Sequence, residues 1–200
     1  MHAPVLVTPP AIQPVTLAEA KAQCRVEDAS EDTLIGVLID AATAHFDGWT
    51  GVLGRCLAEQ TWRQDFDSWA RPLRLPLWPV ISVTSVTYLD ANGDSQTVAS
   101  ANYTLRRDAG GAVVDFLDTY DFPTLQASTP AAVSVTYVAG YADSEDETPV
   151  STAPAPIRQA MLLLIAHWHA NREAVNVGAS VSVYPMAVEA LTAPYRRLTP

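Results

Sequence analysis

The chain has little positive charge. Only one of its 12 basic residues is a lysine, Lys21, and 22 acidic residues give a net charge of −10. Proteins that grip nucleic acid neutralise phosphates with lysine and arginine, so this balance argues against a DNA-binding protein that reads sequence. The arginine pairs Arg106-Arg107 and Arg196-Arg197 are too small to form a basic patch alone.

Cysteine and long apolar runs are also scarce. Cys24 and Cys56 have neither metal-ligand spacing nor the number typical of a disulfide scaffold, and we expect two reduced, buried thiols. The longest apolar run, residues 161–166, is far shorter than a membrane span, so no membrane partner is expected. Residues 1–4 lack the basic and apolar regions of a signal peptide, and we expect a soluble protein that is cytoplasmic when made.

What the chain does have is 48% hydrophobic residues in 200, enough for a proper core. Thr16 and Glu19 form a capping-box pattern that starts a helix from Leu17 to Val26. Ser30 is the expected N-cap of a second helix that runs to about Trp49, whose apolar face includes Phe46 and Trp49. A third, from Ile157 to about Arg172, is apolar on most of its surface and must be covered on several sides.

Between these helices the hydrophobic period changes to that of β-strands. Asn92-Gly93 and Gly110-Gly111 suit hairpin turns, residues 132–138 alternate cleanly, and the register of residues 80–89 suggests a bulge. The expected strands are residues 57–65, 73–77, 80–89, 103–106, 112–116 and 132–138.

These patterns predict an α+β protein: a small helical bundle of two N-terminal helices and a long C-terminal helix, with an antiparallel β insertion and an extended C-terminal arm. The expected parts are an extended N-terminal segment (1–14), the bundle (15–54 and 154–173), the β insertion (56–141), an acidic loop (142–153) and a docking arm (174–200). The arm combines apolar anchors with prolines, which favours binding to a partner over a frayed terminus.

The sequence contains no convincing pattern for a catalytic site or a metal site. His167 and His169 are two apart on a helix and point about 200° from each other, so they do not share a metal; one at the surface and one at a packing seam is the simpler interpretation. Neither cysteine lies in an activated-thiol motif, and Gly110-Gly111 is a turn without the context of a phosphate loop. We therefore expect no enzyme, no metal and no cofactor.

Two alternatives stay open. Asp65 and Asp67 lie beside aromatic residues, and either of them or His169 could serve a hydrolase. The chain could also be a free-standing protein-binding module. Trp62, Trp69 and Trp78 fill the β core by default, unless one of them anchors a neighbouring subunit.

Five stretches of the chain form a recognisable series: 15–21 (VTLAEAK), 38–42 (LIDAA), 157–160 (IRQA), 166–173 (AHWHANRE) and 191–196 (LTAPYR). In this order they resemble head-tail connector (adaptor) proteins of long-tailed phages, prophages and gene transfer agents. The resemblance covers nearly the whole chain, and the Asn-Arg-Glu and Pro-Tyr-Arg sequences are its most specific parts. The β region is longer than in minimal connectors.

The resemblance implies a non-enzymatic ring, typically of twelve identical subunits, at the head-tail interface of a virion or phage-like particle. Its subunits would be made in the bacterial cytoplasm. The ring would dock beneath the portal, lead to a stopper or tail-terminator protein, and pass DNA through its channel without reading sequence. It also implies that the arm binds the portal or a neighbour. The residues we assign to this binding are Trp168, Arg172, Tyr184, Pro185, Met186, Leu191, Pro194, Tyr195, Arg196 and Arg197.

Overall fold

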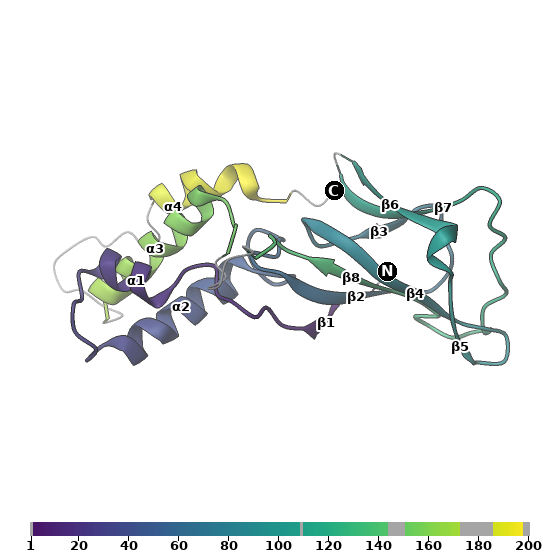
Figure 1. Cartoon of the computed structure of the whole chain (residues 1–200), viewed down its shortest axis with the longest axis horizontal. Coiled ribbons are helices and arrows are strands. Elements are labelled where there is room, and N and C mark those ends of the chain that lie inside the picture. Colours follow the sequence, from purple (N-terminus) through teal and green to yellow (C-terminus); the bar gives the residue numbers. More distant parts are fainter. Residues whose placement is uncertain (1, 109, 144–150, 173–185, 198–200) are drawn as a thin grey trace. The chain divides into compact units, whose positions relative to one another are not determined.

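The chain has an α+β fold made of two compact units (Figure 1). The computed structural model describes residues 2–108, 110–143, 151–172 and 186–197. The β unit consists of residues 1–11 and 59–141, and the helical unit of residues 12–58 and 142–200. The chain thus crosses between the units after residues 11, 58 and 141, and the first eleven residues cluster with the β insertion.

The helical unit is organised around α3, which contacts the other three α-helices among the described residues. Its buried side chains are Ile157, Ala160, Met161, Leu164 and Ile165, so the helix is covered on several sides, as its sequence predicts. The helices are α1 (Leu17–Cys24), α2 (Asp32–Phe46), α3 (Ala155–Ala170) and α4 (Met186–Thr192), and the 3₁₀ turn η2 (Ala193–Tyr195) follows α4 directly.

The start of α1 confirms the predicted capping box. The Glu19 amide donates to Thr16 Oγ1 over 3.2 Å, and the Thr16 amide donates to Glu19 Oε2 over 2.8 Å. The helix ends two residues earlier than predicted because Arg25 takes a left-handed conformation, with φ 59°, and its amide bonds to the Ala22 carbonyl.

The predicted cap of α2 is wrong. Glu31 occupies the N-cap position without a side-chain cap bond, while the Ser30 amide and hydroxyl both donate to the Asp28 carboxylate. Ser30 is therefore used in a local turn that competes with capping. The helix also ends at Phe46 rather than Trp49, because Asp47 is extended.

The β unit contains two antiparallel sheets. One has the strand order β1 (Val5–Thr8), β2 (Gln60–Phe66), β8 (Val133–Ala139), β4 (Val80–Leu89), β5 (Ser95–Thr97). The other has the order β3 (Leu73–Leu75), β7 (Gly111–Phe116), β6 (Tyr103–Asp108), and the 3₁₀ turn η1 (Ser100–Asn102) precedes β6. Gln60, where β2 begins, pairs with Ala139, where β8 ends, so entry to and exit from the insertion are neighbours in one strand pair.

Most predicted strand features are confirmed. β8 alternates between buried and half-buried residues, and β4 shifts register twice against it, between Val80 and Ser82 and between Val83 and Ser85. Gly93 has φ 88° in the β4–β5 turn, and Gly111 has φ 125° where β7 begins.

Strands β1 and β5 were not predicted. β1 lies in the proline-rich segment that we expected to be extended and separate, yet it pairs with β2, with Val5 opposite Arg63. Its three apolar residues stand between Pro4 and Pro9, too short a run to signal a strand. His2 also fixes this segment, because its carbonyl accepts from Gln64 Nε2 over 2.7 Å.

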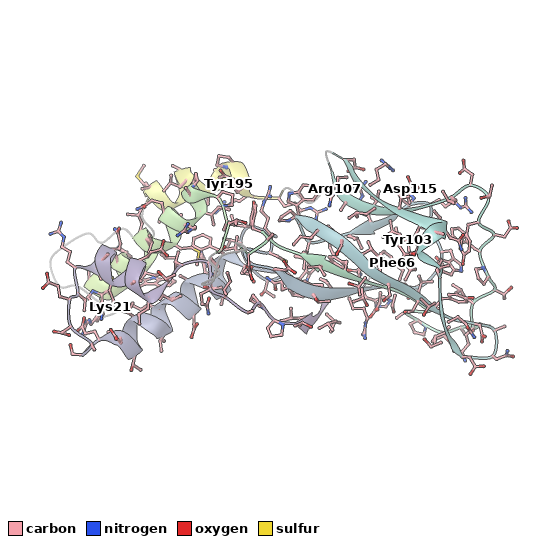
Figure 2. All side chains as sticks on the ribbon, viewed as in Figure 1. Lys21, Phe66, Tyr103, Arg107, Asp115 and Tyr195 are labelled. Carbon is pink, nitrogen blue, oxygen red and sulfur yellow. The ribbon has the colours of Figure 1, made fainter. Side chains whose placement is uncertain are left out.

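The side chain of Arg107 on β6 forms hydrogen bonds between the two sheets (Figure 2). Its guanidinium donates to the carbonyls of Val80 and Ile81 on β4 over 2.9 and 3.0 Å. The side chains of Tyr137, Leu73 and Val113, which come from both sheets, are fully buried. The unit also contains a cluster of aromatic rings, in which Trp69 stacks on Phe122 with ring centroids 4.9 Å apart and meets Phe116 edge-on at 5.6 Å.

Among the described residues, no helix combines the length and the hydropathy needed to cross a membrane.

Candidate docking surface

The C-terminal residues 186–197 are not an extended arm. Residues 186–192 form α4, which packs on α3, and its Val188 and Thr192 side chains are fully buried. These two lie four residues apart, on one face of the helix. Pro194 lies in η2, just after α4, so it follows the helix rather than preventing it. The extended conformation predicted for this part of the arm is therefore wrong.

The end of this segment is bonded to the loop that follows α2. The Arg197 amide donates to the Leu53 carbonyl over 3.0 Å, and Arg55 Nε donates to the carbonyl of Tyr195 (labelled in Figure 2). A Cβ built on Gly54 would lie 3.5 Å from Arg197 Cβ, so the two backbones are in close approach. Residues 193–197 thus have a defined place on the helical unit.

The loop of residues 48–55 is tightly folded. A side chain at Gly51 would meet the Asp47 carbonyl oxygen at 2.3 Å, so only glycine fits there. The Gly48 amide donates to the Arg55 carbonyl over 2.7 Å, and the Val52 amide to the His45 carbonyl over 2.9 Å. This fold leaves Trp49 43% exposed and Val52 41% exposed. Trp49, predicted on the apolar face of the second helix, is instead on this loop.

The predicted binding residues of α4 and η2 differ in exposure. Met186 is 84% exposed, and Pro194 and Arg196 are also exposed. Leu191, Tyr195 and Arg197 are half-buried. The prediction also named Tyr184 and Pro185, which lie outside the described residues.

Arg196 adds positive charge to this surface. One of its guanidinium nitrogens lies 3.9 Å from the Glu189 carboxylate, the outer limit of an ion pair. Burial and, to a smaller extent, the Arg196 charge lower the pKa of His45, which lies in the last turn of α2.

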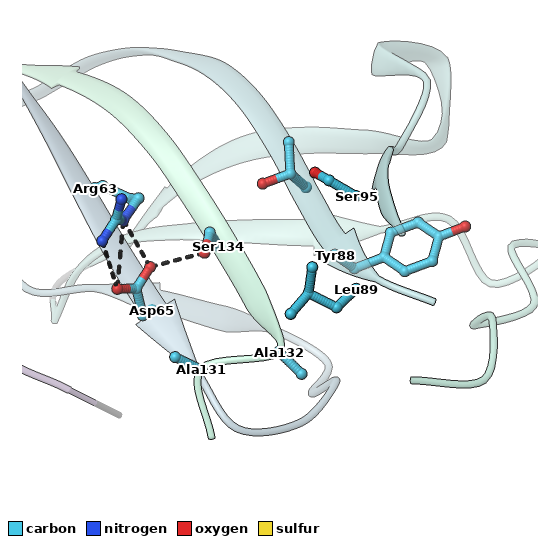
Figure 3. Close-up of a pocket in the computed structure, with 9 residues that line it drawn as sticks. Arg63, Asp65, Tyr88, Leu89, Ser95, Ala131, Ala132 and Ser134 are labelled. Carbon is cyan, nitrogen blue, oxygen red and sulfur yellow. Dashed lines mark hydrogen bonds and ion pairs between the residues drawn. The ribbon is translucent and has the colours of Figure 1, made fainter. Parts of the chain in front are cut away.

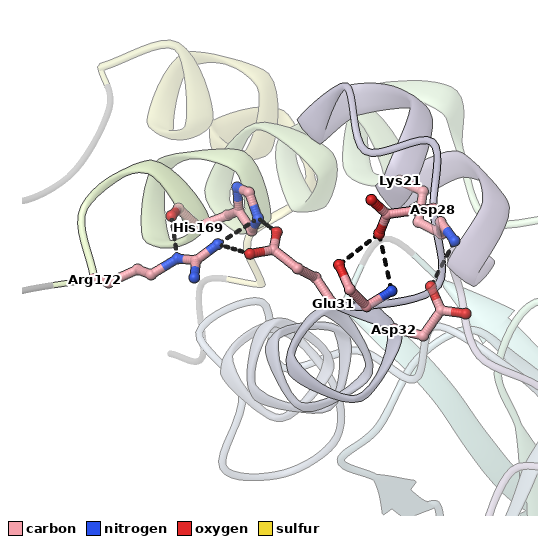
Figure 4. Close-up of polar contacts among 7 residues, drawn as sticks. Lys21, Asp28, Glu31, Asp32, His169 and Arg172 are labelled. Atoms are coloured by element: carbon pink, nitrogen blue, oxygen red, sulfur yellow. Dashed lines mark hydrogen bonds and ion pairs between the residues drawn. The ribbon is translucent and has the colours of Figure 1, made fainter.

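The other predicted residues lie at the end of α3, where polar contacts join it to the start of α2 (Figure 4). Arg172 is exposed and donates to the Glu31 carboxylate, whose other oxygen lies 2.6 Å from His169 Nε2. The hydrogen bonds from Arg172 and then His169 lower the pKa of Glu31. Trp168 is half-buried. We predicted no partner for His169, and no sequence signal linked it to Glu31 across 138 residues.

His167, Cys24 and Cys56 lie at positions where they contribute to helix ends or to packing. The His167 carbonyl accepts from Asn171 Nδ2 over 2.8 Å at the end of α3. Cys56 is buried and Cys24 is half-buried, where burial raises the pKa of its thiol. Within residues 2–108, 110–143, 151–172 and 186–197, no three His, Cys, Asp or Glu side chains gather in a way that could hold a metal ion.

The two acids of the hydrolase alternative are each bonded to different partners. Asp65 borders a pocket of about 270 Å³, where Arg63 donates to its carboxylate over 3.0 Å and Ser134 over 2.7 Å (Figure 3). Asp67 accepts from the Ala131 amide over 3.0 Å, and this bond, followed by the contact with His2, lowers the pKa of its carboxyl. A carboxyl with a lowered pKa is a poor general acid, so Asp67 is unsuited to that role.

Comparison with known proteins confirms the resemblance seen in the sequence. Residues 14–67, which include α1, α2 and β2 up to Phe66, match the family described as phage gp6-like head-tail connector proteins. No curated protein matches the chain.

Solved structures share the fold over almost the full length. A chain in the neck of an empty GTA particle computed with C6 symmetry is 24% identical, with a TM-score of 0.74, and the match covers 98% of this chain and 96% of that one. A chain in the virion of a native gene transfer agent (GTA) particle is 22% identical, with a TM-score of 0.74 and coverages of 100% and 97%. A chain in the neck of a native GTA particle computed with C12 symmetry is 20% identical, with a TM-score of 0.60 and coverages of 98% and 97%.

Proposed function

We propose that this chain is a structural subunit of a head-tail connector, located at the head-tail interface of a virion or phage-like particle. It forms a ring beneath the capsid portal, links the portal to a stopper or tail-terminator protein, and provides a conduit for DNA. The observation that carries the proposal is the match of residues 14–67 to head-tail connector proteins. The full-length likeness to chains of gene transfer agent necks supports it.

In this function the C-terminal segment binds the portal through the exposed side of α4 and η2. Met186, Pro194 and Arg196 give this side apolar surface and positive charge, and arginine is enriched among residues that dominate binding energy. Because Val188 and Thr192 are buried against the helical unit, this surface is already folded before it binds. Docking then requires little ordering of residues 186–197, which favours affinity.

The ring consists of identical subunits, twelve in number. A ring joins two different faces of each subunit, so each copy must offer two separate binding surfaces. Strand β1 supplies one candidate face, since Val5, Leu6 and Val7 are 43%, 43% and 52% exposed at the edge of the five-stranded sheet. An apolar strand at a sheet edge is normally covered by another chain or element.

The charge of the chain suits a conduit. With 22 acidic and 12 basic residues, the ring as a whole repels a phosphate backbone rather than binding it. DNA can therefore pass through without being held.

A charge reversal on the docking side tests the proposal. The double substitution Arg196→Glu and Met186→Glu would be introduced into the gene in cells that produce particles. Both positions are exposed, so the buried side chains of Val188 and Thr192 stay unchanged. We expect DNA-filled heads to accumulate without tails, counted by electron microscopy, while the purified variant keeps its circular dichroism spectrum. Normal tailed particles would contradict the proposed function.

Arg25→Glu is the matched control. Arg25 is an exposed arginine of the same unit, at the end of α1, and its reversal changes the net charge by the same amount as that of Arg196. We expect normal tailed particles from this variant. Loss of tails from it would show that assembly responds to charge in general, which would also contradict a specific role of Arg196.

A further inference from the structure

The two edge strands of the five-stranded sheet, β1 and β5, are both open to solvent (Figure 1). All four residues of β1 and all three residues of β5 are exposed, and no described strand pairs with the outer side of either. A strand at a sheet edge carries backbone N–H and C=O groups with which another strand can pair. Each of these edges can therefore accept an extended segment of polypeptide.

The edges of the three-stranded sheet are protected. Leu73 and Leu75 of β3 are buried, so this edge is covered within the subunit. Strand β6, at the other edge, carries Arg106 and Arg107, and the Arg107 guanidinium is bonded to carbonyl oxygens of β4. Charged side chains on an edge strand are a common protection against pairing between molecules. We therefore do not expect this sheet to pair with a neighbour.

Charge protects neither edge of the five-stranded sheet. No Asp, Glu, Lys or Arg occurs in residues 3–18 or in residues 95–105, although the chain has 22 acidic and 12 basic residues. The acids before β5 belong to the turn, where the Asp90 carboxylate accepts from the amides of Asn92 and Asp94 over 2.9 and 3.1 Å. The two edges that are open to solvent are thus also the two edges without charged side chains.

We infer that β1 of one subunit pairs with β5 of the next, so that the five-stranded sheets of neighbouring subunits join around the ring. This inference rests on the proposed function and deepens it, because it names both of the faces that a ring of identical subunits requires. Two different edges give the head-to-tail contact of a ring, whereas β1 paired with β1 of another copy would give a closed dimer. Hydrogen bonds between backbones supply the attraction, as in other cases where a strand is added to a sheet.

The length of the two strands limits the strength of each contact. β5 has three residues, and β1 shifts register against β2 between Leu6 and Thr8, so only a short stretch of each strand is regular. A pairing this short is weak between two free subunits. In a ring each subunit is held by two neighbours at once, which raises the overall strength without any longer strand.

Cysteine pairs across the two edges test the pairing. Within one sheet β1 and β5 are four strand spacings apart, about 19 Å, whereas a disulfide joins Cα atoms less than about 7 Å apart. Any disulfide between the two edges must therefore join two chains. Each of residues 5–7 would be changed to cysteine together with each of residues 95–97, as in Leu6→Cys with Gln96→Cys, so that every register is covered.

Particles purified from producing cells would be oxidised, and this protein would be examined on non-reducing gels. We expect at least one combination to give a ladder of covalent dimers, trimers and larger multimers. Unchanged thermal unfolding of the purified variants would show that they are folded, as expected for exposed positions.

Leu6→Cys with Thr104→Cys is the matched control, because Thr104 is exposed on β6, an edge of the other sheet. We expect no ladder from this pair, and none from the wild type, in which Cys56 is buried and Cys24 is half-buried. An equal ladder from the control pair would overturn the inference, because the contact would not be specific to β5. Covalent dimers from Leu6→Cys alone would also overturn it, because β1 would then meet β1 of another copy.

The same gels separate the inference from the proposed function. If the variants are present in tailed particles and no combination gives a ladder, other surfaces join the subunits and only the inference fails. If wild-type particles do not contain this protein, the proposed function fails and the inference fails with it. If folded variants of β1 and β5 are lost from particles while Thr104→Cys is retained, the two edges are needed for assembly, which supports the inference.

Discussion

Arg55 and Tyr195 are 140 residues apart in sequence, and a hydrogen bond joins Arg55 Nε to the Tyr195 carbonyl oxygen. Together with the bond from the Arg197 amide to Leu53, it fixes the C-terminal segment against the loop after α2. The position of one segment therefore depends on the fold of the other.

Replacing Arg55 by alanine should loosen residues 193–197. The bond has a charged donor but is only partly buried, so we expect a local loss of about 1 kcal/mol. Amide hydrogen exchange in a peptide covering 186–197 should become roughly fivefold faster, since exchange follows local opening. Arg25→Ala is the control and should leave this peptide unchanged. Equal exchange in Arg55→Ala and wild type would mean that the bond does not hold the segment.

Replacing Val188 by alanine should destabilise the packing of α4 on α3. Val188 is fully buried, and the loss of buried methyl groups costs about 1–2 kcal/mol. Urea unfolding monitored by circular dichroism measures the change. Met186→Ala, at a position 84% exposed on the same helix, should stay within about 0.5 kcal/mol of wild type. Similar values for both variants would argue against a packed α4.

Replacing Gly51 by alanine should disrupt the loop. The new Cβ would meet the Asp47 carbonyl oxygen at 2.3 Å, which forces the backbone to move and should cost at least about 2 kcal/mol. Gly36 is the matched position, because a Cβ there meets nothing within 4 Å. Gly36→Ala lies inside α2 and should stabilise the protein by about 0.5–1 kcal/mol. Thermal unfolding of the pair should therefore shift in opposite directions.

The contacts of Glu31 should make stability depend on acid pH. Its pKa is lowered from 4.5 by the bonds from Arg172 and His169, so the folded state binds a proton less readily than the unfolded state. The stabilisation is complete above about pH 4.5 and disappears as pH falls through the lower folded pKa. Unfolding free energy measured from pH 7 to pH 3 should thus fall more steeply for wild type than for Glu31→Gln. If the unfolding free energy of wild type and of Glu31→Gln fell equally with pH, Glu31 would not be a source of the pH dependence.

The sequence predicted what local pattern controls. The capping box of α1, the alternation of β8 and the bulges of β4 follow from residue spacing, and the structure has all three. It missed β1 because three apolar residues between prolines carry almost no periodic signal, and pairing with β2 is what makes them a strand. Trp49 was misplaced because a helical period continues through residues 46–49, whereas the Asp47 backbone ends the helix.

The candidate surface was predictable only in part. Composition drew attention to the C-terminal residues, since prolines, an aromatic ring and two arginines stand close together. The conformation of α4 depends on contacts with α3, which no local rule reports. In the sequence, the loop of residues 48–55 showed only glycines that end a helix, and its position next to Arg197 depends on a long-range hydrogen bond.

The pairing of Gln60 with Ala139 has a consequence for how such proteins vary. Because the inserted segment of residues 59–141 leaves and returns through adjacent residues of one strand pair, its two ends stay together whatever its length. Sheets can lengthen, shrink or gain a hairpin on the far side without any change in the spacing between α2 and α3. The length of the insertion and the packing of the helices can therefore change independently of each other.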